Sequence, residues 1–161
     1  MLSIFTCASR VTPGPDAGDL EAWHDAYRSL GLPAVLDPPD VVVRTSAALA
    51  ALELPVPLGR LVRSQLMQPG PVLCAGDRWL FFADPADAWP RGSAYAELRQ
   101  AGAVLHEQWS RITLPSSATG DSRKWITEPR LPAPANGTPG YALPRLWTVT
   151  RAVRKAVAAQ Q

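Results

Sequence analysis

The 161-residue sequence is poor in side chains that bind soft metals, with two cysteines and two histidines. Cys7 and Cys74 lie in the apolar segments "IFTCAS" and "PVLCAG", and no CxxC pair occurs. Because structural zinc sites need closely spaced Cys and His ligands, this scarcity argues against a zinc site. We expect both cysteines to be buried thiols in a reducing compartment.

A secretory signal peptide is not expected from the N-terminal residues, and no long apolar segment occurs in the sequence. The N-terminal "MLSIFTCASR" has no basic stretch before its short apolar run, unlike a secretory signal. The longest apolar run, "TSAALAALELPVPL", is interrupted by Glu53 and two prolines and is too short to cross a bilayer. The sequence therefore predicts a soluble, cytoplasmic protein that does not enter membranes.

Short catalytic motifs are absent as well: GxxxxGKS/T, GxGxxG, GxSxG and HExxH do not occur. Asp37 and Asp40 flank two prolines, which favours a turn over a rigid strand face. Asp84 begins a loop, where aspartate is common as a turn residue. A metal site formed by Asp37, Asp40 and Asp84, in a nucleotidyl transferase or nuclease, is the alternative that stays open.

Proline and glycine are abundant, with 17 and 11 residues, so many connections between short elements are expected. The chain is 47% hydrophobic and 19% charged, which is ordinary for a globular protein. Its length suits one domain over residues 1–161. The net charge of +2 is too small to indicate nucleic-acid binding by itself.

Hydrophobic periodicity predicts a mixture of helices and strands. Helices are expected at residues 19–31, 47–54, 57–67, 93–102 and 145–159, with Ser46 and Ser93 as caps of the second and fourth. Strands are expected at 2–9, as two extended pieces around a Pro-Pro turn within 34–46, and in a hairpin over 70–85 turning at "AGD". A second hairpin is expected over 103–115, turning near Glu107 to Trp109. The predicted fold class is α/β or α+β, a small antiparallel or mixed sheet backed by helices, with an amphipathic C-terminal helix.

Three predicted helices carry an apolar stripe that we expect to be buried. The stripes are Leu20, Trp23, Tyr27 and Leu30; Leu58, Leu61, Val62 and Leu66; and Leu146, Val149, Val153 and Val157. The six tryptophans are expected mainly in the core, with stacking on bases as the alternative.

The segment 114–125, "LPSSATGDSRKW", ends a predicted strand with small polar residues, a glycine and a basic pair. Such backbone NH groups and cations are candidates for phosphate contacts that do not read sequence. The candidate contacts are Ser116, Ser117, Gly120, Arg123 and Lys124, joined by Arg151, Arg154 and Lys155 if the last helix shares this face. Solvated loop and helix charges are the simpler explanation.

Read together, "RITLPSSATGDSRKWITEPRLP" resembles the closing signature of the primase–polymerase domain of bifunctional DNA primase/polymerases. That signature runs from a strand into Pro-Pro-Ser, then a glycine, a tryptophan, Leu-Pro and a terminal helix. The matching positions are Leu114-Pro115, Ser116, Ser117, Gly120, Trp125, Leu131-Pro132 and residues 145–159. The hairpin at 70–85 resembles the family's central hairpin. The resemblance implies an RRM-like core of the archaeo-eukaryotic primase superfamily, whose shorter relatives are common in actinobacteria.

The catalytic residues that the resemblance implies are missing from this chain. The family's Asp-x-Asp is expected near Val41 to Arg44, where "VVVR" stands. Its motif histidine falls near Trp79 and its third acid near Val104. Because aliphatic side chains cannot bind Mg²⁺, the sequence predicts a polymerase-like fold without polymerase chemistry.

The resulting hypothesis is a non-catalytic, regulatory binding protein without a cofactor. Its partner is the phosphate backbone of DNA or RNA, or another protein. The alternatives are the metal-dependent enzyme and a homodimeric interaction module that buries exposed tryptophans.

Overall fold

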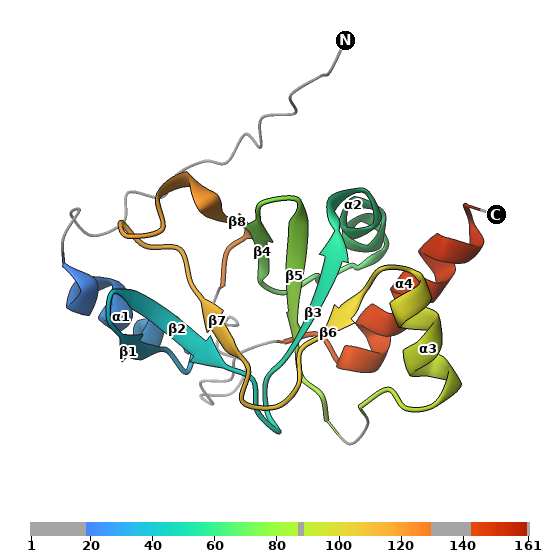
Figure 1. Ribbon diagram of the computed structural model, residues 1–161, viewed down its shortest axis with the longest axis horizontal. Helices are drawn as coiled ribbons and strands as arrows, with labels where there is room; N and C mark the ends of the chain where they lie inside the picture. Colours follow the sequence, from blue (N-terminus) through green and yellow to red (C-terminus); the bar gives the residue numbers. More distant parts are fainter. Residues whose placement is uncertain (1–18, 87–88, 130–142, 161) are drawn as a thin grey trace, which may run out of the picture.

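The computed structural model describes residues 19–86, 89–129 and 143–160. These residues form four α-helices and eight β-strands in an α+β arrangement (Figure 1), so the predicted fold class is confirmed. The strands build two antiparallel sheets, one of three strands and one of five. The strand predicted at 2–9 lies outside the described residues.

The five-stranded sheet has the order β6-β3-β5-β4-β8. Its strands are β3 (Ala50–Pro55), β4 (Val72–Ala75), β5 (Arg78–Ala83), β6 (Val104–Leu105) and β8 (Arg123–Thr127). The helix α2 (Val56–Gln65) connects β3 to β4, and α3 (Ser93–Gln100) connects β5 to β6. The chain order β3-α2-β4-β5-α3-β6, with this strand order, is the split β-α-β arrangement of ferredoxin-like and RRM-like cores.

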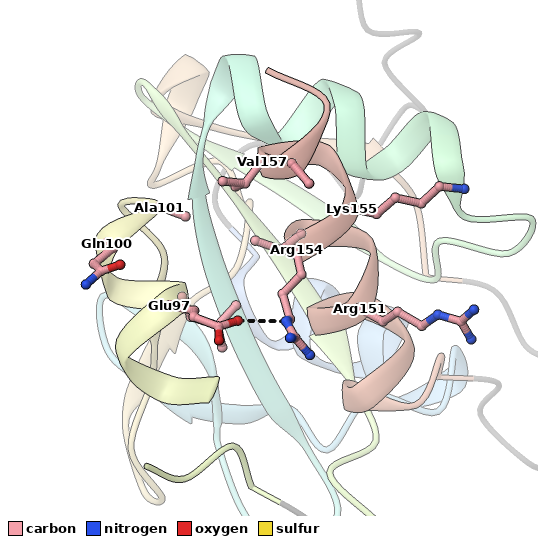
Figure 2. A pocket seen from close by; sticks show the side chains of 10 residues that line it. Glu97, Gln100, Ala101, Arg151, Arg154, Lys155 and Val157 are labelled. Carbon is pink, nitrogen blue, oxygen red and sulfur yellow. Dashed lines mark ion pairs between the residues drawn. The ribbon is translucent and has the colours of Figure 1, made fainter. Parts of the chain in front are cut away.

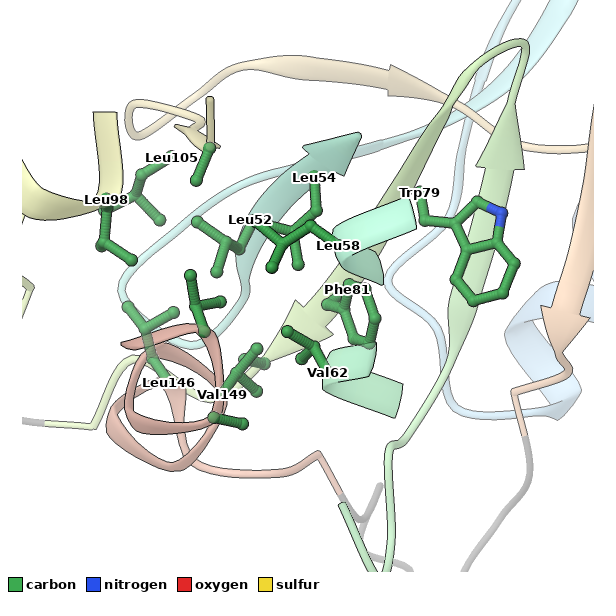
Figure 3. Close-up of a cluster of buried hydrophobic side chains, with 14 of the residues drawn as sticks. Leu52, Leu54, Leu58, Val62, Trp79, Phe81, Leu98, Leu105, Leu146 and Val149 are labelled. Carbon is green, nitrogen blue, oxygen red and sulfur yellow. The ribbon is translucent and has the colours of Figure 1, made fainter. Parts of the chain in front are cut away.

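One face of this sheet is covered by α2, α3 and α4 (Leu146–Ala158). Figure 3 shows the apolar cluster between them, to which the sheet contributes Leu52 and Phe81 and the helices contribute Val62 and Val149. These four side chains are fully buried. The buried stripes predicted for α2 and α4 are therefore largely confirmed. Leu61 is the exception, because it is 39% exposed on the outer side of α2.

The other face is covered by α1 (Leu20–Ser29) and the three-stranded sheet. That sheet has the order β1-β2-β7 and consists of β1 (Val35–Asp37), β2 (Asp40–Arg44) and β7 (Arg111–Thr113). Tyr27, Val43 and Ile112 from these elements meet Leu80 and Phe82 of β5 in a second apolar cluster. The stripe predicted for the first helix faces this cluster, as expected, and Asp19 caps that helix by accepting from the Ala22 amide at 3.0 Å.

The hairpin predicted at 70–85 is confirmed. Ala75 and Arg78 are the last paired residues of β4 and β5, so Gly76 and Asp77 form a two-residue turn. Gly76 has a φ of +63°, the left-handed conformation that such turns require and that glycine adopts without strain.

The helix predicted at 47–54 is wrong, because Ala50–Pro55 form strand β3. Alanine and leucine favour helices, but here the segment is an interior strand of the larger sheet, between β5 and β6. Ala50 and Leu52 face the helices while Ala51 faces the other cluster, and all three are fully buried. A strand buried on both faces has no alternating pattern, which is why the sequence resembled a buried helix. Ser46 lies in the turn before it and accepts from the Ala48 amide instead.

The hairpin predicted at 103–115 is also wrong. Its two strands exist, but β6 pairs with β3 in the larger sheet and β7 pairs with β2 in the smaller one. The segment therefore crosses from one sheet to the other. Ser93 is the first residue of α3 and not its cap, since Gly92 holds the cap position.

Candidate functional site

The segment 114–125 is a compact turn whose polar groups mostly bind one another. The Ser116 amide donates to Thr119 Oγ1 at 2.9 Å, and the Thr119 amide and hydroxyl donate to the Ser116 carbonyl at 3.2 and 2.9 Å. Gly120 opens a short 3-10 helix (Gly120–Ser122) with a φ of +52°. The amides of Ser116 and Thr119, which a phosphate site in this turn would use, are therefore already hydrogen-bonded inside the turn.

Ser116 and Ser117 differ in their surroundings. Ser116 is 6% exposed, and its hydroxyl has no hydrogen-bond partner among the described residues. Ser117 is exposed. One predicted contact is thus accessible to a ligand and the other lies inside the protein.

The basic pair Arg123 and Lys124 is split by the strand that carries it. Both residues belong to β8, and successive side chains of a strand point to opposite faces. Arg123 donates to the Thr113 carbonyl at 3.0 Å, on the side of the three-stranded sheet. Lys124 pairs in register with Cys74, which packs against the helical side. Arg123 and Lys124 therefore lie on opposite faces of the sheet and do not form one phosphate-binding pair.

Trp125 anchors the end of the segment in the second cluster. Its indole Nε1 donates to the Tyr27 hydroxyl at 3.1 Å, and that hydroxyl donates to the Pro115 carbonyl at 2.5 Å. Burial raises the pKa of Tyr27 to about 12. The turn and its tryptophan are held to α1 by these contacts, which assigns the segment a structural role.

The basic residues of α4 lie elsewhere. In Figure 1, β8 forms one edge of the larger sheet, whereas α4 packs against α2 and α3 toward the opposite edge. Arg151, Arg154 and Lys155 are exposed and lie off the buried stripe of α4. They line a groove of about 650 Å³ between α3 and α4 (Figure 2). The structure thus keeps this part of the predicted patch together and separates it from segment 114–125.

Charge is unevenly distributed over the helices. The basic residues of α2, α3 and α4 are Arg60, Arg63, Arg99, Arg151, Arg154 and Lys155, and all are exposed. Glu97 is their single acidic residue. We call α2, α3 and α4 together the helical layer. Six positive charges less one negative charge give this layer a net charge of +5, against +2 for the whole sequence. All other residues together carry −3, so the helical layer is the cationic side of the molecule.

The carboxylates of Asp37 and Asp40 come together, but around an arginine. Arg111 Nε lies 2.7 Å from Asp37 Oδ2, and Arg111 Nη2 lies 2.8 Å from Asp40 Oδ2. The hydrogen bond from Arg111 is the main cause that lowers the pKa of Asp37, and Arg44 at 3.8 Å adds to it. Asp84 pairs with Arg145 at 3.1 Å. No group of three or more His, Cys, Asp or Glu side chains able to hold a metal ion occurs in the described ranges.

The positions where the resemblance places catalytic residues are structural in this fold. Val41, Val42 and Val43 are fully buried in the three-stranded sheet, and Trp79 is 6% exposed against Gly59. Val104 is half exposed on the edge strand β6. A carboxylate at any of the three valines would be buried away from water, which is costly unless it is paired with a cation.

Sequence reasoning missed Trp109. Its indole is 70% exposed, and its φ of +70° is rare for a bulky residue. The buried Thr45 holds this loop: the Trp109 amide donates to the Thr45 carbonyl at 2.8 Å, and the Ser110 amide donates to Thr45 Oγ1 at 2.9 Å. Thr45 Oγ1 also donates to the Glu107 carbonyl. No local sequence pattern indicates such a contact between residues so far apart in the chain.

Glu97 was missed as well. Its Oε2 lies 2.7 Å from Arg154 Nε across the groove. A count of charges in each predicted helix would have singled it out as the one acid of the helical layer.

Comparison with known proteins gives no relative: no protein-family model, curated protein or solved structure matches the chain. The resemblance to primase–polymerase domains therefore stays a prediction from the sequence motif. None of the helices built by the described residues has the length and apolar character needed to cross a bilayer.

Proposed function

We propose that the protein is a non-catalytic binding protein that holds the phosphate backbone of nucleic acid on the helical layer of α2, α3 and α4. The observation that carries this proposal is the charge of that layer, six exposed cations against Glu97 alone. Cations that neutralise phosphates release counterions from nucleic acid, which gives affinity without sequence readout.

The fold supports the further proposal that the chain is a degenerate primase–polymerase-like domain. Its larger sheet has the β-α-β-β-α-β order of an RRM-like core. Both faces of that sheet are covered by the chain's own elements. The larger sheet therefore offers no open face to nucleic acid, and the proposed contacts are the exposed cations of the helices.

Fluorescence anisotropy with labelled DNA and RNA, over a series of salt concentrations, tests the proposal. Arg151→Ala with Lys155→Ala is expected to weaken binding by roughly 10-fold or more near 0.1 M salt and to lower the salt slope by about two. The matched control is Arg28→Ala with Arg91→Ala, which removes two exposed cations outside the helical layer. An equal loss in both double variants, or binding that does not depend on salt, would contradict the proposal.

A second candidate function is protein interaction, for which Trp109 is the specific observation. Exposed tryptophan is the residue type most enriched at the energetic centres of interfaces. Here it is fixed by Thr45 in a strained backbone conformation, and strain of this kind is common at functional sites. A homodimer is the form of this hypothesis that can be tested without knowing a partner.

Sedimentation equilibrium at several protein concentrations tests the homodimer. Trp109→Ala is expected to shift the protein toward monomer, whereas Trp147→Ala, which removes another exposed tryptophan on α4, is expected to leave the equilibrium unchanged. A wild-type protein that is monomeric at every concentration would exclude the homodimer.

A further inference from the structure

The groove between α3 and α4 is amphipathic. Its apolar lining comes from Leu98 and Val153, which are 2% and 1% exposed, and from the half-buried Ala101 and Val157. Its polar lining comes from Glu97, Gln100, Arg151, Arg154 and Lys155. A volume of about 650 Å³ is within the range of sites that hold small organic ligands. The groove therefore offers an apolar surface and anion-binding side chains side by side.

Arg154 occupies the centre of this arrangement. Figure 2 shows its guanidinium directed to Glu97 of α3, while Arg151 and Lys155 point away from α3. Neither Arg151 nor Lys155 has an ion pair with a described residue. Arg154 and Glu97 are 61% and 46% exposed at their side chains, so their pair is weak and open to competition by another anion.

We propose that the groove binds one nucleotide unit of a single-stranded nucleic acid. The phosphate displaces Glu97 from Arg154, and the base lies on the apolar surface of Ala101 and Val157. This inference rests on the proposed function and adds to it the site, the strandedness and a competing residue.

Single strands fit this groove better than duplexes for a chemical reason. In a duplex the base faces are stacked inside the helix, so only phosphates and groove edges reach a protein surface. An unpaired base can leave the stack and cover apolar side chains while its phosphate meets a cation. Arginine suits the phosphate because its planar guanidinium offers paired donors.

Glu97 then lowers the affinity of the groove for a phosphate. It neutralises Arg154 in the free protein and repels an incoming phosphate. Its replacement by glutamine keeps the shape of the side chain and removes both effects. Glu97→Gln is expected to bind single-stranded DNA about 2- to 5-fold more tightly, the range expected when an exposed ion pair is removed as a competitor.

A substitution that fills the groove without changing its charge is expected to weaken the binding of single-stranded nucleic acid. Ala101→Phe is expected to weaken binding of a labelled single-stranded oligonucleotide several-fold while duplex binding changes little. Arg154→Ala is expected to weaken single-strand binding, and Arg154→Lys to restore it only in part. Circular dichroism checks the fold of each variant. Glu97→Gln touches no buried contact and so keeps the test valid if Ala101→Phe does not fold.

The outcomes separate this inference from the proposed function. Unchanged single-strand affinity in both Glu97→Gln and Ala101→Phe, with the loss in Arg151→Ala/Lys155→Ala retained, would overturn the groove and leave backbone binding in place. Equal competition by a poly-glutamate peptide would overturn the assignment of a nucleotide. Absence of any nucleic-acid binding by the wild-type protein would reject both.

Discussion

Tyr27 explains why segment 114–125 is ordered as it is. Its hydroxyl bridges the Pro115 carbonyl and the Trp125 indole, which are at the two ends of the turn. Its ring lies 6.0 Å from that of Trp23 and 6.1 Å from that of Trp125. A single side chain on α1 thus connects the segment that follows β7 with the middle of β8, and it stabilises the second cluster.

Tyr27→Phe tests this role. The substitution keeps the ring but leaves the Pro115 carbonyl and the Trp125 NH without their partner in a buried region. We expect the free energy of unfolding to fall by about 1–3 kcal/mol, measured by urea denaturation with an unchanged m-value. Tyr95→Phe, on the exposed side of α3, is the control and should change stability little.

The same residue predicts a pH dependence. The pKa of Tyr27 is about 12 in the folded protein and 10.0 ordinarily, so the unfolded chain loses this proton first as pH rises. The contribution of Tyr27 is fully present below pH 10 and is lost between about pH 10 and 12. The difference in stability between wild type and Tyr27→Phe should therefore shrink over that window. A constant difference would show that folding does not raise the pKa of Tyr27.

Elements marked by a clear hydrophobic period or by a turn motif could be predicted from the sequence, as the hairpin of β4 and β5 was from its turn at Gly76 and Asp77. The helices α1, α2 and α4 bury one stripe and expose the rest, which leaves a 3.6-residue pattern in the chain. Strand β3 is buried on both faces, so its alanines and leucines carry no period of two. Strands β6 and β7 are two and three residues long, and their partners lie far away in sequence. The sequence predicts their presence, but only tertiary pairing shows which sheet each of them joins.

The candidate site shows the same division. The exposure of Arg151, Arg154 and Lys155 follows from helical periodicity and was predictable. Arg123 and Lys124 look like one basic pair when the chain is read as a loop, but in strand β8 they diverge. The pairing of Glu97 with Arg154 joins two helices that are not adjacent in the chain, so no local pattern contains it. Thr45 and Trp109 are linked in the same non-local way.

At the scale of the whole molecule, the two apolar clusters lie on opposite faces of the larger sheet. The same strands contribute side chains to both clusters. Phe81 faces the helices and Phe82 faces the three-stranded sheet, although they are neighbours in β5. Strand β4 is divided in the same way between Val72 and Leu73. Loss of packing on one face therefore disturbs the strands that form the other. This sharing predicts that the described residues unfold as one cooperative unit, as expected for a single domain.

Val149→Ala provides the test, because Val149 is fully buried in the helical cluster and lies far from β2 in the chain. The substitution is expected to lower the free energy of unfolding by about 1–3 kcal/mol, through lost burial and the cavity it leaves. Native-state hydrogen exchange should then show the same decrease in protection for the amides of β2 as for those of β3 and β5. Val43→Ala, on the other face, should reciprocally lower the protection of α4. If β2 kept its protection in Val149→Ala, the three-stranded sheet would unfold independently, and the helical layer would be a separate folding unit that carries the cationic surface alone.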